Sequence, residues 1–216
     1  MLRSMFQEQL DEVAERIQVL GTAVLKQLDA AIDGLSTKNR AAVQQIIDND
    51  ADINKSELDI NEKVFDIIAR QQPVATDLRR LIVVMKMAGD LERVADFAVD
   101  IAKVSRRIDD FPNEELKQEL IELALDAKGM IEKALHAYAT KNVLTAQQLA
   151  KADDEIDERF GKLIKKLFRQ ETTDQDVEAI TQLAFIARYI ERIADYATNL
   201  SEWILYEANG QYVDLN

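Results

Sequence analysis

The chain of 216 residues contains no cysteine, only two prolines and only six glycines. The absence of cysteine excludes disulfides, thiolate metal sites and cysteine nucleophiles. A chain of this length can bury a sizeable core without such cross-links. The scarcity of proline and glycine, together with 47% hydrophobic and 31% charged residues, is typical of long helices joined by short turns. We therefore expect an all-α fold.

Positive charge and long apolar stretches are also scarce. The chain has 27 Lys and Arg against 40 Asp and Glu, a net charge of −13, which opposes binding to nucleic acids and to anionic lipid. The N-terminal sequence MLRSMFQEQLDEVAERI includes acidic residues and lacks the apolar region of a signal peptide. No later stretch approaches the roughly 20 apolar residues that cross a bilayer. We expect a soluble, cytoplasmic protein that binds no nucleic acid and spans no membrane.

The spacing of apolar residues predicts six long helices. Apolar positions alternate spacings of four and three from Phe6 onward, which is typical of one face of a helix, and this helix is predicted to end near Gly34. The second predicted helix carries many apolar residues, Leu58 and Phe65 among them. It ends just before Pro73, which disfavours helical geometry in the preceding residue and is itself expected at the first position of the next helix. The remaining predicted helices cover residues 74–108, 114–138, 142–169 and 173–208.

The chain contains an internal repeat. LERVADFAVDI at 91–101 recurs as IERIADYATNL at 190–200, and both copies keep a Glu and an Asp four residues apart. STKNRAAVQQIIDNDADIN at 36–54 aligns without gaps to ATKNVLTAQQLAKADDEID at 139–157. Self-similarity over such a length indicates two copies of one structural unit. We expect two tandem three-helix bundles, formed by residues 1–111 and 112–216.

The repeated acids occupy unusual positions on their helices. At about 100° per residue, Glu92 falls in the middle of the apolar stripe, and Asp96 and Asp100 follow along one edge. Glu191 repeats this position in the second copy, with Asp195 and Asn199 along its edge. A carboxylate that is removed from water without a partner is strongly disfavoured or takes up a proton. Each buried Glu therefore needs a partner.

The predicted hairpins bring further acids opposite these motifs. Counting back from the turn between helices two and three sets Asp50 and Asn54 opposite Glu92 and Asp96. The same count in the second copy sets Asp153 and Asp157 opposite Glu191 and Asp195. Side chains four apart on a helix lie about 5–6 Å apart, and oxygen ligands suit hard cations. The sequence thus predicts two cation sites, although Arg93, Arg192 or an arginine from a third helix could neutralise the acids instead.

The chain resembles the PhoU family, the accessory proteins of phosphate-specific transport. The resemblance covers essentially the whole chain and rests on an ordered set of motifs: QQPVATDLR at 71–79, LERVAD at 91–96, ARYIERIADYATNLSE at 187–202, and D-x-x-I-N or D-x-x-I-D at 50–54 and 153–157. It implies two similar three-helix bundles and no established enzymatic reaction. It also implies a negative regulator of phosphate uptake and phosphate-starvation signalling. The implied partners are the phosphate ABC transporter ATPase, a phosphate-sensing histidine kinase and a second copy in a homodimer.

The resemblance further implies that iron or zinc binds at the acidic motifs. Because Asn54 and Asn199 replace acids that the other copy retains, the two sites need not have equal affinity. The residues expected to hold metal are Asp50, Asn54, Glu92, Asp96, Asp100, Asp153, Asp157, Glu191, Asp195 and Asn199.

Two other functional classes remain open. One is a metal-dependent hydrolase or di-iron oxidase built on the carboxylates, and the other is a metal-free helical scaffold. The enzyme alternative has little support, because the chain has no cysteine and no Gly-rich phosphate-binding loop. His136, the single histidine, is expected at or near the surface of the fourth helix rather than in a metal site.

Overall fold

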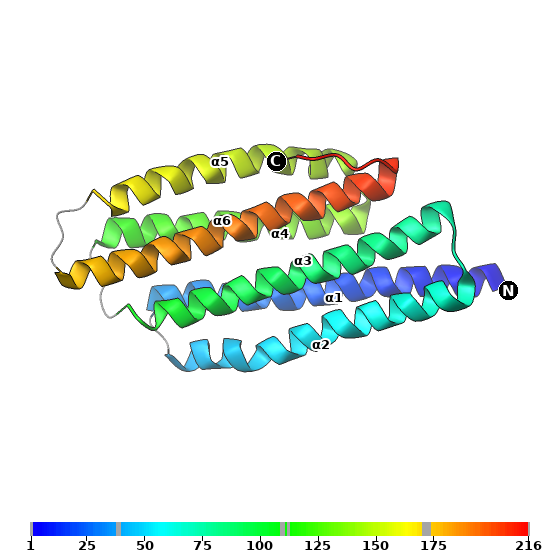
Figure 1. Cartoon of the computed structure of the whole chain (residues 1–216), viewed down its shortest axis with the longest axis horizontal. Coiled ribbons are helices and arrows are strands. Elements are labelled where there is room, and N and C mark those ends of the chain that lie inside the picture. Colours follow the sequence, from blue (N-terminus) through cyan, green and yellow to red (C-terminus); the bar gives the residue numbers. More distant parts are fainter. Residues whose placement is uncertain (1, 38–39, 109–110, 112, 170–173, 216) are drawn as a thin grey trace.

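The computed structural model describes residues 2–37, 40–108, 111, 113–169 and 174–215 (Figure 1). These residues form six helices and no strand, which confirms the predicted all-α class. None of the described helices is long and apolar enough to cross a membrane. The helices are α1 (Leu2–Thr37), α2 (Arg40–Gln71), α3 (Ala75–Ser105), α4 (Glu114–Thr140), α5 (Val143–Leu167) and α6 (Asp174–Asn209).

The helices are arranged as two bundles side by side. Helices α2, α3, α6 and α5 follow one another in that order, and α1 and α4 lie behind them in the view of Figure 1. Helix α1 packs on α2 and α3, while α4 packs on α5 and α6. The bundles meet where α3 packs on α6 and α1 packs on α4. This architecture is the predicted pair of three-helix bundles.

Asparagines cap the N-termini of α4 and α5. The side chain of Asn113 accepts a hydrogen bond of 2.7 Å from the backbone N–H of Glu115, and the side chain of Asn142 accepts one of 3.1 Å from Thr145. Each bond satisfies a backbone donor that has no partner inside its helix. Lys141, between the two helices, has a left-handed φ of 53°. The chain therefore reverses within a very short connection.

The start of α3 differs from the prediction. Pro73 precedes the helix instead of occupying its first position, because Val74 has the extended backbone of an N-cap and α3 begins at Ala75. The preceding residue, Gln72, has a left-handed φ of 47°. The chain thus changes direction at Gln72 and Pro73, and helical geometry begins only after that reversal.

Two other helix ends also differ. Helix α3 ends at Ser105 rather than near Ile108, whose backbone N–H donates to the Ser105 carbonyl, only three residues back, as in a tightened final turn. Helix α1 continues to Thr37 beyond the end predicted near Gly34, since a glycine inside a helix lowers stability by only about 1 kcal/mol relative to alanine. Pro112, part of the expected stop after α3, lies outside the described residues. The remaining predicted boundaries agree within two residues.

One hydrophobic core runs through both bundles. Leu91 and Ile190, which occupy equivalent positions of the two repeats, are fully buried in the same cluster. Phe97 and Tyr196, also equivalent, face each other between α3 and α6 with ring centroids 5.9 Å apart. Because the central helices share these contacts, the two bundles form one packed structure.

A hydrogen bond also joins the two central helices. Trp203 Nε1 on α6 donates to Asp90 Oδ2 on α3 at a distance of 2.7 Å. Burial raises the pKa of Asp90 to about 6, even though the bond from Trp203 and the charge of Lys86 lower it. Ionisation of Asp90 therefore disfavours the folded state.

We predict that Asp90 makes the protein less stable as the pH rises from about 4 to about 6. In that window the folded chain binds more protons than the unfolded chain, so the free energy of unfolding falls with increasing pH. Asp90→Asn keeps an acceptor for Trp203 and removes the charge. It should raise the free energy of unfolding near neutral pH by about 1–2 kcal/mol. Urea unfolding across this pH range measures the effect, and equal stability of parent and variant near neutral pH would contradict it.

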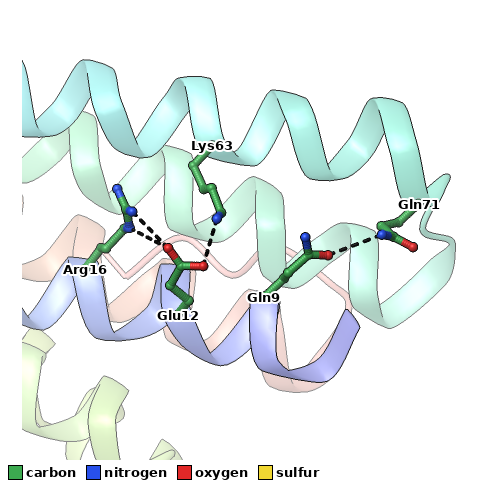
Figure 2. Close-up of polar contacts among 5 residues, drawn as sticks. All are labelled: Gln9, Glu12, Arg16, Lys63 and Gln71. Atoms are coloured by element: carbon green, nitrogen blue, oxygen red, sulfur yellow. Dashed lines mark hydrogen bonds and ion pairs between the residues drawn. The ribbon is translucent and has the colours of Figure 1, made fainter. Parts of the chain in front are cut away.

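Polar side chains connect α1 to α2 (Figure 2). Glu12 of α1 lies between two cations, with Arg16 Nη2 2.8 Å from its Oε1 and Lys63 Nζ of α2 2.8 Å from its Oε2. Nearer the start of α1, Gln71 Nε2 donates to Gln9 Oε1 at 3.3 Å. Such solvent-accessible contacts orient the helices more than they stabilise them.

Some apolar residues of α2 do not enter the core. Leu58 and Phe65 expose 60% and 59% of their surface, whereas the neighbouring Ile60 and Val64 are buried. Helix α2 thus has apolar side chains on its outer face as well as on its core face.

Candidate metal site

Carboxylates from two helices converge in the second repeat. Asp157 lies on α5, and Glu191 and Asp195 lie one turn apart on α6. Ligand oxygens of these three residues all lie within 4.8 Å of one another. We call this group the second-repeat acidic cluster. The hairpin register places the three residues opposite one another, as the sequence predicts.

The cluster is strongly acidic and only partly shielded from solvent, because Asp157 is exposed. Glu191 is only 8% exposed, and Asp195 is half-buried. Burial raises the pKa of Glu191, and repulsion from Asp195 raises it further. Burial also raises the pKa of Asp195, with repulsion from Asp157 adding to the effect and Arg192 opposing it. A cation among these oxygens would remove the repulsion.

Two arginines neutralise part of this charge. Arg188 pairs with Glu191 Oε1, and Arg192 Nη1 lies 3.0 Å from Asp195 Oδ2. The side chains of Arg188 and Arg192 are 52% and 39% exposed, so both pairs border on solvent. Glu191 Oε2 is buried and has no hydrogen-bond partner within the described residues. Arginine pairing therefore leaves one buried acceptor of the cluster unsatisfied.

Asp153 adds a fourth carboxylate beside the cluster. It is 8% exposed, and burial, followed by repulsion from Asp195 and Asp157, raises its pKa to about 6. The hydroxyl of Thr198 lies near enough to lower that pKa slightly. Neither Thr198 Oγ1 nor Asp153 Oδ1, however, has a hydrogen bond of good geometry within the described residues. A second buried acceptor thus lies beside the three converging carboxylates.

The acids of the first repeat are close but do not converge in the same way. No three of them bring ligand oxygens as close together in the described part of the chain. Burial raises the pKa of Glu92, and Asp96 and Asp50 raise it further. Burial likewise raises the pKa of Asp100. Arg93 lies 2.9 Å from Asp96 and 3.5 Å from Glu92, so a single arginine pairs with both acids here.

Two residues near the first-repeat acids were not predicted. The charge of Glu57 on α2 raises the pKa of Glu92. Glu57 follows Asp50 by seven residues, which is two helical turns, so the spacing indicates that both lie on the same face of the helix. Gln27 of α1 is 5% exposed and donates to Asp50 Oδ1 at 3.4 Å and to the Ala95 carbonyl at 3.2 Å. Nothing in the acidic motifs indicates a residue from the first helix.

The remaining predicted residues have less defined surroundings. Asn54 Oδ1 is buried and has no hydrogen-bond partner within the described residues, at the position equivalent to Asp157. Asn199 is half-buried one turn after Asp195. His136 is exposed on α4, as expected. The neutral Asn54 explains why the first repeat lacks the carboxylate that completes the second.

Known proteins resemble this chain along nearly its full length. The PhoU domain family matches residues 17–105 and 120–204, once in each bundle. The phosphate-specific transport system accessory protein PhoU homolog of Clostridium acetobutylicum is 33% identical, with all of both chains covered. The phosphate-specific transport system accessory protein PhoU of Escherichia coli is 28% identical, over 95% of this chain and 86% of its own length.

Solved structures agree with this relationship. The crystal structure of the phosphate transport system regulatory protein PhoU from Streptococcus pneumoniae has a TM-score of 0.89 at 27% identity, and covers 97% of this chain and 99% of that one. The crystal structure of PhoU from Pseudomonas aeruginosa has a TM-score of 0.90 at 28% identity, over 95% of this chain and 100% of that one. The double domain match, the full-length relatives and the shared fold together show that this chain belongs to the PhoU family of phosphate transport accessory proteins.

Proposed function

We propose that this protein is a cytoplasmic, non-enzymatic regulator that lowers phosphate uptake and phosphate-starvation signalling. It contacts the ATPase of a phosphate ABC transporter and a phosphate-sensing histidine kinase, and it acts as a homodimer. The observation that carries this proposal is the PhoU domain match in both halves of the chain. The names of the relatives, accessory proteins of phosphate-specific transport, support the same role.

We further propose that the second-repeat acidic cluster binds a metal cation. Asp157, Glu191 and Asp195 would supply oxygen ligands, with Asp153 beside them. The support is the convergence of three carboxylates within 4.8 Å together with the unsatisfied buried oxygens of Glu191 and Asp153. A bound cation would lower the repulsion among these groups and satisfy acceptors that the arginines do not reach.

The ligand chemistry bears on which metal would bind. Carboxylate oxygens suit hard cations, whereas zinc in proteins is most often held by Cys and His as well as by carboxylates. The cluster offers no such sulfur or nitrogen ligand, because the chain has no cysteine and its single histidine is exposed on α4. Of the two expected metals, iron in its ferric form fits this ligand set better. The same lack of a nearby histidine gives the enzyme alternative no support.

A bacterial strain without its own PhoU protein provides a test of the regulatory role. Expression of this chain is expected to lower a phosphate-starvation reporter, such as phosphatase activity, several-fold in phosphate-rich medium, because the chain would restrain both the transporter and the kinase. The transporter ATPase and the kinase should also be recovered with the tagged chain from the same cells.

The necessary control is a folded variant with an altered acidic cluster. Glu191→Gln, checked by circular dichroism and by its amount in the cell, should repress the reporter less than the parent chain if metal supports the contact. An unchanged reporter with the parent chain, at a protein level equal to that of a functional PhoU, would contradict the regulatory proposal. Equal repression by parent and variant would contradict only the role of the metal.

A further inference from the structure

The outer face of α2 carries a regular stripe of exposed residues. Its members follow one another at spacings of four and three, which places them on one side of the helix. In Figure 1, α2 lies at one edge of the molecule, and within the described residues it packs only on α1 and α3. All members are exposed, and Leu58 and Phe65 are exposed by 60% and 59%. We call this the α2 outer stripe: Ala51, Lys55, Leu58, Glu62, Phe65 and Ala69.

The two charges of the stripe have no partners of their own. Lys55 and Glu62 form no ion pair within the described residues. Another cation of the same helix does have one, since Lys63 pairs with Glu12 across α1 and α2 (Figure 2). The stripe thus presents a cation and an anion seven residues apart, on either side of an exposed leucine. This arrangement is complementary to itself when it is turned end over end.

We propose that the α2 outer stripe packs antiparallel on the same stripe of a second copy of this chain. A two-fold axis beside Leu58 sets Lys55 of each copy opposite Glu62 of the other, and the two Leu58 side chains meet near the axis. Phe65 then lies opposite the small Ala51. The alternating spacing is that of helices which pack in a coiled-coil manner, and an isologous contact of this kind closes as a dimer. This inference rests on the homodimer of the proposed function and assigns its surface.

The equivalent face of α5 is less suited to this contact. Glu158, Gly161 and Lys165 of α5 correspond to Lys55, Leu58 and Glu62 of α2, at the constant offset of the repeat. Antiparallel packing of α2 on α5 of another copy would set Lys55 against Lys165 and Glu62 against Glu158.

Packing of α5 on itself is disfavoured for other reasons. Gly161 offers no apolar side chain at the centre of the stripe, and Glu158 is already paired with Lys162 at 2.6 Å. The charge pattern therefore favours contact between two α2 helices over the other pairings. Because one pair of helices buries a small area, the dimer belongs to the weak end of specific interfaces.

Charge reversal of the full-length chain tests the pairing directly. Lys55→Glu and Glu62→Lys each turn two attractive contacts of the dimer into two repulsive ones, and each should weaken dimerisation about tenfold or more. An equimolar mixture of the two variants should form a heterodimer as strong as the parent dimer, because both contacts are then attractive again. Analytical ultracentrifugation from micromolar to millimolar protein, with and without a metal chelator, measures dimerisation of the parent chain, of each variant and of the mixture.

A matched variant distinguishes this surface from non-specific association through exposed apolar residues. Leu58→Ala should weaken the dimer, whereas Leu144→Ala, which truncates a leucine of α5 that is 71% exposed, should not. A dimer that forms in the mixture of the two charge-reversed variants, but in neither variant by itself, supports the pairing of Lys55 with Glu62. A parent chain that stays monomeric at every concentration overturns both the dimer and the surface. The proposed surface is wrong if neither charge reversal weakens the parent dimer, or if the chain assembles beyond a dimer. The phosphate-starvation reporter tests the regulatory role separately.

Discussion

Glu191→Gln is expected to lower the affinity of the protein for iron or zinc by about 100-fold or more, since it removes a charged ligand where even outer-shell changes cost about 10–100-fold. Glu191 contributes one of the three ligand oxygens that lie within 4.8 Å of one another, and its Oε2 is buried without a hydrogen-bond partner in the described residues. Metal per chain, measured on protein purified without chelator, and calorimetric titration of metal-free protein both measure the change. Metal at about 100 times its dissociation constant should stabilise the parent by about 2.7 kcal/mol and the variant by much less.

The same substitution should have the opposite effect in the absence of metal. Burial raises the pKa of Glu191, so its ionisation disfavours the folded state, and this loss of stability develops as the pH rises above the ordinary value of 4.5. Metal-free Glu191→Gln should therefore be at least as stable as the metal-free parent near neutral pH. A lower stability would show that the pair with Arg188 is what satisfies Glu191, and would favour the metal-free scaffold.

The first repeat provides matched controls for this prediction. Glu92→Gln changes the equivalent residue of a repeat in which no three acids of the described residues bring their ligand oxygens within 4.8 Å of one another, and it should reduce metal binding much less. Asn54→Asp supplies the carboxylate that Asp157 provides in the second repeat. It should raise the affinity of the first repeat for metal. Equal losses of metal affinity in Glu92→Gln and Glu191→Gln would contradict the proposal that the two repeats bind metal unequally.

Leu91→Ala and Ile190→Ala are each expected to lower the free energy of unfolding by about 3 kcal/mol, because each leaves a cavity in the buried core. Both side chains are fully buried, and both belong to the one hydrophobic cluster that contains residues of both bundles. Since the two bundles share this core, either substitution should shift a single transition seen by circular dichroism during urea unfolding.

The equivalent positions of Leu91 and Ile190 make this pair a test of cooperativity. If the bundles were independent, Leu91→Ala would move only an early or a late transition and Ile190→Ala would move the other. Val19→Ala, which truncates a side chain that is 66% exposed, provides the control and should change stability by less than about 0.5 kcal/mol. Two separate transitions in the parent chain would contradict the shared core.

The acidic motifs show how far the sequence reaches into the candidate site. Helical periodicity places Glu191 and Asp195 on one face, and the length of the hairpin places Asp157 opposite them. Both follow from regular geometry, so both were predictable. The contribution of Gln27 was not, because α1 follows no fixed register against the α2–α3 hairpin. The pairing of Arg188 with Glu191 was also missed, since the direction of a long surface side chain depends on its local surroundings.

The amino-acid sequence alone was enough to predict the helical class, the doubling of a three-helix unit and the family. Helix formation and capping depend on neighbours within a few residues, and a repeat is visible in the letters alone. The packing of the helices was needed to show that three carboxylates converge in the second repeat but, among the described residues, not in the first. It was also needed to show that Leu58 and Phe65 lie outside the core. Those outcomes depend on how far apart and at what rotation neighbouring helices pack, which is set by the fit of side chains along the whole interface.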